Sequence, residues 1–191
     1  MYKVLKGLLK GHKFNPMEWD NPSIRIDDNG NQIVGRPSLG FGNSNEFQYA
    51  GRTLAARPWT PELSRIKRAC QEALHPLTKK ELTFCLAGYY PEAKGIPHHS
   101  DTVPTVYDWV ASCSLGGSRV FTWRQYCSII KEHSITSKIN TRGLTYYDTL
   151  ILLEDGDVII FDGHSQKTST HDVPELHYTA PRINLTFRTG L

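Results

Sequence analysis

The residues of this sequence best suited to metal chemistry lie in one short segment, GIPHHSDT, at positions 95–102. His99 and Asp101 are two residues apart, so in an extended strand their side chains point to the same side. Such a pair also arises by chance, as a surface or structural hydrogen bond. With one more histidine it would form the two-histidine, one-carboxylate set that binds non-haem iron(II) and leaves coordination positions open for oxygen chemistry.

The third ligand of such a set has to come from a distant part of the chain. The downstream candidates are His133, His164, His171 and His177. His171 is best placed, because it lies in THDVP, one loop after the apolar run DVIIFDG. His164 falls in the glycine turn after that run, where a residue facing solvent is the simpler interpretation.

A second chemical pattern is the C-terminal segment PRINLTFRTG. Arg182, Asn184, Thr186 and Arg188 alternate with apolar residues, so in a strand they share one face. If that face is outside, the segment is an ordinary edge strand. If it lines the interior, two buried arginines are costly unless they meet anions, and a dicarboxylate matches two guanidinium groups.

The remaining sequence predicts the elements that position these residues. DDNGNQ, between SIRI and QIVG, predicts a hairpin. Thr60 and Pro61 predict the start of a helix whose apolar residues recur at helical spacing, namely Leu63, Ile66, Cys70 and Leu74. Six β-like runs follow, at residues 82–90, 107–115, 118–126, 148–156, 157–163 and 182–190, with residues 128–148 as an insertion. This order predicts a mainly β protein with flanking helices, an antiparallel sandwich or barrel of the jelly-roll kind.

Length and composition are those of a single domain. The chain has 191 residues, a formal charge of +3 and four well-separated cysteines, which we interpret as reduced and mostly buried thiols. No apolar run approaches the roughly 20 residues of a membrane span. MYKVLKGLLKGHKF, at the N-terminus, is interpreted as a short amphipathic packing helix, with a membrane-surface segment as the alternative.

Four motifs in order resemble the AlkB family of iron(II)- and 2-oxoglutarate-dependent dioxygenases, and GIPHHSD is particularly similar to the AlkB-like domains of RNA viruses. The motifs are YPEAKGIPHHSD, SCSLGGSRVFTW, LLEDGDVIIFDGHSQKTSTHDVP and RINLTFR. The resemblance covers residues ~37–191 and implies a double-stranded β-helix that demethylates alkylated bases in DNA or RNA. It implies one domain over residues 1–191, with N-terminal helices and a nucleotide-recognition lid in about 1–80 and a jelly-roll core in about 82–191.

Residue by residue, the resemblance makes His99, Asp101 and His171 the iron ligands. It pairs Arg182 with the distal carboxylate of 2-oxoglutarate and Arg188 with the end that chelates iron, with Asn184 between them and a hydrogen bond from Tyr90. The residues it suggests for stacking on a flipped base are Phe41, Phe47 and Tyr49. Packing within the core is the alternative for Tyr90 and for at least one of Phe47 and Tyr49, and Trp59 is assigned to packing.

Two positions depart from the family pattern. Val103 stands where many members have an acidic residue that contacts the exocyclic amine of the base, which leaves the substrate open. Gly88 stands where an Asn commonly contacts 2-oxoglutarate, so one hydrogen bond to the cosubstrate is lost.

The expected function is oxidative demethylation of N-alkylated bases in single-stranded RNA or DNA, using iron(II), 2-oxoglutarate and O2. The modest charge disfavours tight binding to long duplexes, and the lid shows no clear wedge to fill the gap left by a flipped base. We expect a monomer that acts in the cytoplasm or nucleus without contacting membranes. The alternatives are a 2-oxoglutarate-dependent hydroxylase of a protein or small molecule, and a catalytically silent nucleic-acid-binding jelly roll.

Overall fold

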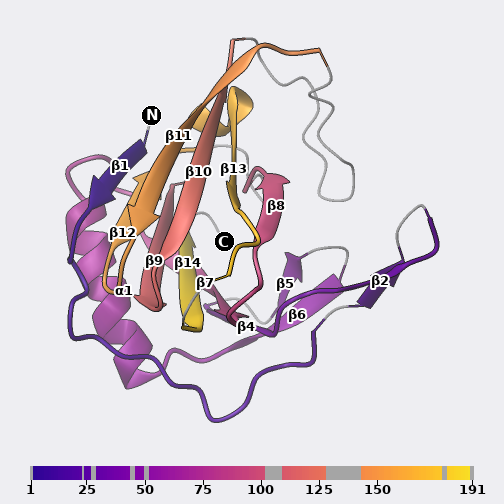
Figure 1. Cartoon of the computed structure of the whole chain (residues 1–191). Coiled ribbons are helices and arrows are strands. Elements are labelled where there is room, and N and C mark those ends of the chain that lie inside the picture. The colour runs from indigo at the N-terminus through magenta and orange to yellow at the C-terminus, as the bar shows by residue number, and fades with distance from the viewer. Residues whose placement is uncertain are drawn as a thin grey trace.

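The computed structural model describes residues 2–22, 24–26, 29–43, 46–49, 52–101, 109–127, 143–177 and 180–189, without the side chains of residues 25, 46–49, 52 and 54. Two sheets form the body of the protein (Figure 1). The larger sheet has the order β1 (Tyr2–Leu5), β12 (Val158–Phe161), β9 (Val110–Gly116), β14 (Arg182–Thr189), β7 (Leu82–Tyr90), β4 (Ser38–Gly42), β6 (Arg52–Arg57) and β5 (Glu46–Tyr49).

The smaller sheet lies across the larger one and carries two of the predicted metal-binding residues. Its order is β11 (Tyr146–Leu153), β10 (Arg119–Tyr126), β13 (Ser169–Val173) and β8 (Ile96–His99). All of its pairings are antiparallel, and a short 3-10 helix, η1 (Ser165–Lys167), precedes β13. Two packed sheets with this strand order form the jelly roll that the sequence predicted.

The helix α1 (Pro61–Leu74) covers the outer face of the large sheet (Figure 1). The side chain of Thr60 caps it by accepting a hydrogen bond from the backbone N–H of Leu63 at 3.2 Å. The four predicted apolar residues of α1 are fully buried, and they pack on the odd-numbered residues of β14 and β7, such as Leu185, Phe187 and Cys85. The even-numbered residues from Leu86 to Tyr90 and from Arg182 to Arg188 therefore face the space between the two sheets.

Two further expectations about the chain are confirmed. The hairpin forms from β2 (Ile24–Ile26) and β3 (Gln32–Val34). Cys70, Cys85 and Cys113 are buried thiols, and the sulfur atoms of Cys70 and Cys113 lie 3.4 Å apart, well beyond a disulfide bond of about 2.05 Å. Within the described ranges, no helix has the length and apolar character needed to traverse a membrane.

The predicted N-terminal helix is wrong. Residues Tyr2–Leu5 form the edge strand β1, which pairs antiparallel with β12, and a series of turns follows it. Gly7 and Gly11 have φ angles of 64° and 84°, in the left-handed region that a right-handed helix excludes. The apolar residues are still used for packing, because Leu9 is fully buried and Val4 contacts the core between the sheets.

Asp157 fixes this N-terminal segment to the turn before β12. Its buried carboxylate accepts hydrogen bonds from the backbone N–H of Gly7 at 2.7 Å, from that of Glu154 at 2.8 Å, and from the ammonium of Lys6. Burial would raise the pKa of Asp157, but these hydrogen bonds outweigh it and hold the pKa below its ordinary value. The carboxylate therefore contributes stability in its ionised form.

We expect Asp157→Ala to lower the free energy of unfolding by about 3 kcal/mol, because two backbone N–H groups and an ammonium lose their shared acceptor. Urea unfolding measures this, and Glu154→Ala is the control, since its exposed ion pair with Lys6 is worth less than about 1 kcal/mol. The folded pKa of Asp157 lies below the unfolded value of about 3.9, so the contribution is present above that pH and is lost as pH falls through the folded pKa. Equal losses from both variants would contradict this account.

Candidate metal centre and anion pocket

The side chains of His99, Asp101 and His171 converge between the two sheets. One ligand atom from each lies within 4.8 Å of the others. Nε2 of His99 is 3.7 Å from one carboxylate oxygen of Asp101, and Nε2 of His171 is 3.5 Å from the other. His99 ends β8 and is the register partner of His171 on β13, so the pairing of these two strands brings the histidines together.

The backbone fixes the tautomer of His99. Its Nδ1 is 2.9 Å from the carbonyl oxygen of Pro97, which can only accept, so Nδ1 carries the proton and Nε2 is left with a lone pair. A hydrogen bond of this kind is the usual support of a metal-binding histidine.

The imidazole of His171 is 5% exposed and is surrounded by rings. Phe121 and Trp123 stack on it at centroid distances of 5.2 and 6.1 Å, and Phe161 lies tilted at 5.2 Å. This packing orients the ring toward Asp101 and restricts its rotation.

Asp101 is held at both its side chain and its backbone. A guanidinium nitrogen of Arg188 donates to its carboxylate at 2.6 Å. Gln166 of η1 accepts from the backbone N–H of Asp101 and donates to its carbonyl oxygen at 3.2 Å. The side chain of Gln166 thus fixes the segment just after β8, and sequence reasoning missed it, because a glutamine beside a glycine turn carries no distinctive signal.

The charge states of the cluster are those that a metal requires. Burial, followed by the neighbouring His171, lowers the pKa of His99 to about 3. Burial alone would raise the pKa of Asp101, but Arg188 and the two histidines hold it well below its ordinary range. At neutral pH, His99 is therefore a neutral lone-pair donor and Asp101 a carboxylate.

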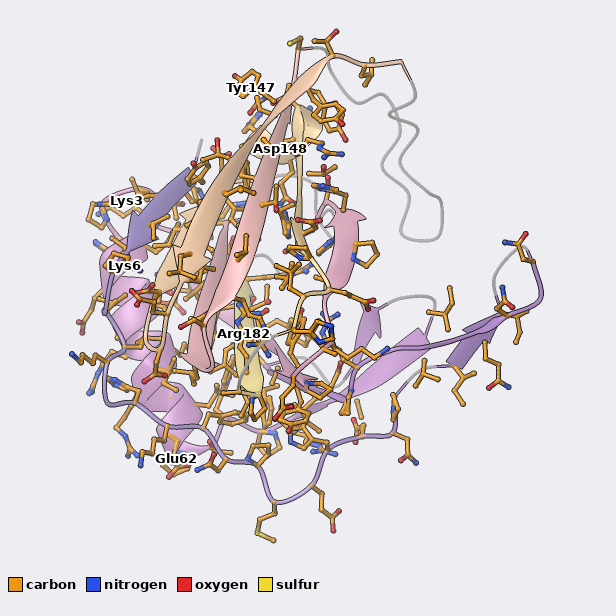
Figure 2. The ribbon with its side chains drawn as sticks, viewed as in Figure 1. Lys3, Lys6, Glu62, Tyr147, Asp148 and Arg182 are labelled. Atoms are coloured by element: carbon orange, nitrogen blue, oxygen red, sulfur yellow. The ribbon has the colours of Figure 1, made fainter. Side chains whose placement is uncertain are left out.

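A cavity of about 470 Å³, its open mouth included, joins this cluster to a group of arginines. Arg182, Asn184, Thr186 and Arg188 of β14 line it, together with Tyr90, and Arg182 is labelled in Figure 2. The polar face of the C-terminal strand is therefore interior, and Arg182 and Arg188 are 2% and 5% exposed.

Arg182 is held at one end and open at the other. Its Nε donates to the hydroxyl of Ser114 at 2.8 Å, and its guanidinium carbon lies 5.1 Å from the centroid of the Tyr90 ring. Its buried Nη1 has no hydrogen-bond partner among the described residues. Burial, together with the charges of Arg119 and Arg36, lowers the pKa of Arg182 to about 10, because an uncompensated cation is unfavourable there.

Asn184 has a different environment from its two neighbouring arginines. Its amide nitrogen donates to the hydroxyl of Ser112 at 2.9 Å and to the carbonyl of Cys113 at 2.8 Å, and its oxygen accepts from Thr186 at 2.9 Å. The side chain is thus fixed by β9 and β14 at the wall of the cavity, between the two arginines in the strand.

Two cations of this region were not predicted from sequence. Arg36 lines the cavity, and its guanidinium lies 4.8 Å from the centroid of the Tyr90 ring. Arg119 is fully buried and donates to the carbonyl oxygens of Tyr90 and Pro91 at 3.4 Å each. Arg36 precedes β4 in a turn-rich segment, and no periodic pattern points to its role.

The structure corrects one substrate expectation and leaves others open. Phe41 is 3% exposed, and its ring packs edge-on against Phe14 at 5.7 Å, so it belongs to the core and offers no face to a base. Phe47 and Tyr49 lie on β5, which pairs with β6, but their side chains are outside the described residues. Val103 and His133 are outside them too, whereas the alternative ligands His164 and His177 are exposed.

We expect Gln166→Ala to weaken metal binding by about 10- to 100-fold, because the backbone of Asp101 loses both of its hydrogen bonds to this side chain. Titration with Mn(II) or Fe(II) without oxygen measures the affinity. Gln125→Ala is the matched control, since that amide donates instead to the carbonyl oxygens of Tyr126 and Thr168. Equal affinities for the two variants would show that Gln166 does not position the ligand.

Comparison with known proteins agrees with this geometry. Residues 16–188 match the model of the 2OG-Fe(II) oxygenase superfamily. The mouse (Mus musculus) alpha-ketoglutarate-dependent dioxygenase alkB homolog 3 is 30% identical over 149 residues, 75% of this chain and 48% of that protein. Mouse DNA oxidative demethylase ALKBH2 is 26% identical over 161 residues, 81% of this chain and 62% of that protein.

The chain spans about half the length of the first of these curated relatives. A solved structure of OsALKBH1 shares the fold at 19% identity, with a TM-score of 0.53 over 98% of this chain and 97% of that one. The superfamily match covers nearly the whole chain and includes the cluster, the cavity and the C-terminal strand. The chain therefore belongs to the 2OG-Fe(II) oxygenase superfamily, and the curated relatives that it resembles are AlkB homologues.

Proposed function

We propose that this protein oxidatively removes N-alkyl groups from bases in single-stranded nucleic acid. The observation that carries the proposal is that the cluster of His99, Asp101 and His171 and the arginines of β14 line the same cavity. The similarity to a named DNA oxidative demethylase supports nucleic acid as the substrate class.

The residues present fit both the metal and the cosubstrate. His99, Asp101 and His171 would hold iron(II), since two neutral imidazoles and a carboxylate are its preferred ligand set in such oxygenases. Arg182, whose buried Nη1 has no partner among the described residues, would take the distal carboxylate of 2-oxoglutarate, and Tyr90 would donate to the same molecule. Arg188 would serve its metal-binding end while it holds Asp101.

Iron(II) with 2-oxoglutarate supplies the activation of O2 that oxidises an N-alkyl carbon, which then leaves the base as an aldehyde. The contribution of the chain is positional. The rings of Phe121, Trp123 and Phe161 exclude water around His171 and keep its Nε2 directed at the cluster. Arg188 keeps Asp101 ionised, and the pairing of β14 with β9 fixes Arg182 and Arg188 in the wall of the cavity that the ligands also line.

The preference for single strands rests on charge and on the cost of flipping a base. A formal charge of +3 spread along the chain gives few phosphate contacts, and a base in a single strand avoids an unpairing cost of a few kcal/mol. The lesions that fit are small N-alkyl groups, such as those of 1-methyladenine and 3-methylcytosine. Val103 predicts loose discrimination between bases, since no carboxylate stands there to contact the exocyclic amine.

Formaldehyde release from matched single- and double-stranded methylated oligonucleotides tests this proposal. We expect faster release from the single strand, with both bases accepted.

The hairpin β2–β3 projects from the body, and its Ile24 and Ile26 are each 62% exposed (Figure 1). Apolar projections can fill the gap that a flipped base leaves in a duplex. Faster release from the duplex would therefore implicate this hairpin and overturn the single-strand preference.

The second candidate is hydroxylation of a protein or small molecule by the same centre, and Val103 in place of an acidic residue favours it. It predicts succinate formation that methylated oligonucleotides do not stimulate.

We further propose that the protein acts as a monomer inside the cell, where its three buried cysteines remain thiols. Sedimentation velocity measures the oligomeric state.

A further inference from the structure

Gly88 leaves a gap in the wall of the cavity. It lies within β7, paired with Ser38 of β4 on one side and Asn184 of β14 on the other. Leu86 and Tyr90, its neighbours on the same face of the strand, both line the cavity. A side chain at position 88 would therefore project into the space where the cosubstrate is expected.

The side chain of Arg36 occupies this gap. A Cβ atom added to Gly88 would lie 2.7 Å from Nε of Arg36, which is too close to persist, and 3.3 Å from its Cδ, which is tight, so the side chain of Arg36 would have to shift. The guanidinium of Arg36 extends beyond Gly88 and lies over the ring of Tyr90, with 4.8 Å between its carbon and the ring centroid. The absence of a side chain at Gly88 is thus what allows Arg36 to reach Tyr90.

The backbone of Arg36 is attached to the same strand. The carbonyl of Pro37 accepts a hydrogen bond from the N–H of Tyr89 at 3.0 Å. The hydroxyl of Ser38 donates to the carbonyl of Arg36 at 3.2 Å. The backbone of Arg36 is therefore fixed directly beside Gly88 and Tyr90. This limits the conformational entropy that Arg36 loses when its guanidinium binds an anion.

The charges of the cavity favour an anion at this position. Among the described residues that line it, Asp101 alone is acidic, against Arg36, Arg182 and Arg188. Arg188 already donates to Asp101 at 2.6 Å. Arg36 and Arg182 both lie against the ring of Tyr90, at 4.8 and 5.1 Å from its centroid, and the charge of Arg36 contributes to the lowered pKa of Arg182. A dicarboxylate bound beside them would offset this repulsion.

We propose that Arg36 is a third cosubstrate arginine, which binds a carboxylate of 2-oxoglutarate from the space that Gly88 leaves open. The inference rests on the assignment of this cavity as the cosubstrate site, given above. In this arrangement no side chain at position 88 contacts the cosubstrate. Arg36, some fifty residues earlier in the chain, makes the contact with the carboxylate instead.

Calorimetric titration of 2-oxoglutarate into the Mn(II)-loaded protein tests the inference without turnover or nucleic acid. We expect Arg36→Ala to weaken binding by about tenfold or more, as for other charge-assisted contacts. Arg36→Lys should recover part of the loss, since it keeps the charge but not the fork. Arg65→Ala, which removes an exposed arginine of α1, is the control and should bind like the parent protein.

A second pair of variants tests the role of Gly88. Gly88→Ala should weaken 2-oxoglutarate binding in the parent protein, because its Cβ displaces Arg36. In an Arg36→Ala background the same substitution should add little, because the side chain it displaces is gone. Thermal unfolding of each variant without ligand shows whether the fold is intact.

The outcomes separate this inference from the function proposed above. If Arg182→Ala weakens 2-oxoglutarate binding and Arg36→Ala stays within about twofold of the parent, the cavity assignment holds and Arg36 is not a cosubstrate residue. If neither variant weakens binding, the cavity assignment itself is wrong. Equal effects of Gly88→Ala in both backgrounds would show that Gly88 acts independently of Arg36.

Discussion

Replacement of His171 by alanine should abolish iron(II) binding and turnover while the fold remains. Nε2 of His171 lies 3.5 Å from Asp101, and the cluster has no other histidine on β13 to take its place among the described residues. With one ligand lost, two donors remain, and we expect the affinity for Fe(II) or Mn(II) to fall by more than about 100-fold. Metal titration and succinate formation measure the two effects.

His164→Ala is the matched control for this experiment. His164 is exposed and precedes η1, seven residues before His171 in the chain. We expect this variant to keep both metal binding and turnover, and thermal unfolding without metal should show both variants folded. Full activity of His171→Ala, or loss of activity in His164→Ala, would show that the ligand set is assigned incorrectly.

Replacement of Arg182 by lysine should raise the 2-oxoglutarate concentration needed for half-maximal turnover by about 10- to 100-fold. An ammonium is a point charge that cannot reproduce the two-pronged contact of a guanidinium with a carboxylate. Lysine also loses the planar geometry that places Nε on Ser114 and Nη1 toward the cavity. Turnover as a function of 2-oxoglutarate, at saturating iron, measures the change.

Arg65→Lys on the exposed surface of α1 controls for the exchange of arginine for lysine itself. An unchanged 2-oxoglutarate dependence in Arg182→Lys would remove this arginine from the cosubstrate site. A fall in maximal turnover at an unchanged dependence would instead show that Arg182 acts after the cosubstrate is bound.

The sequence predicted the elements that have a local signal. The helical spacing of the apolar residues and the Thr60 cap predicted α1. The alternation of polar and apolar residues in Arg182–Thr189 predicted a strand with one polar face. The position of that face was left open by the sequence, because an exposed edge strand has the same alternation. The pairing of β14 with both β7 and β9 places it in the interior of the sheet, where its arginines are buried.

The errors and omissions have a common physical cause, which is that tertiary contacts decided the outcome. Val4, Leu5, Leu8 and Leu9 have the spacing of an amphipathic helix, but the edge of β12 was available for pairing with Tyr2–Leu5, and Gly7 and Gly11 have positive φ. Phe41 lies in a lid-like segment but packs on Phe14. Arg36 reaches the site from the segment before β4 and Gln166 from the short helix η1, and neither segment has a periodic sequence signal.

We propose that one centre couples 2-oxoglutarate oxidation to removal of an N-alkyl group from a base. The most direct measurement is succinate and formaldehyde formed together on a single-stranded oligonucleotide that carries 1-methyladenine, with the unmethylated oligonucleotide in parallel. We predict equal amounts of the two products with the methylated strand, and little of either when 2-oxoglutarate is omitted or His171 is replaced by alanine. Succinate formed equally with both strands, and no formaldehyde from the methylated one, would contradict the account.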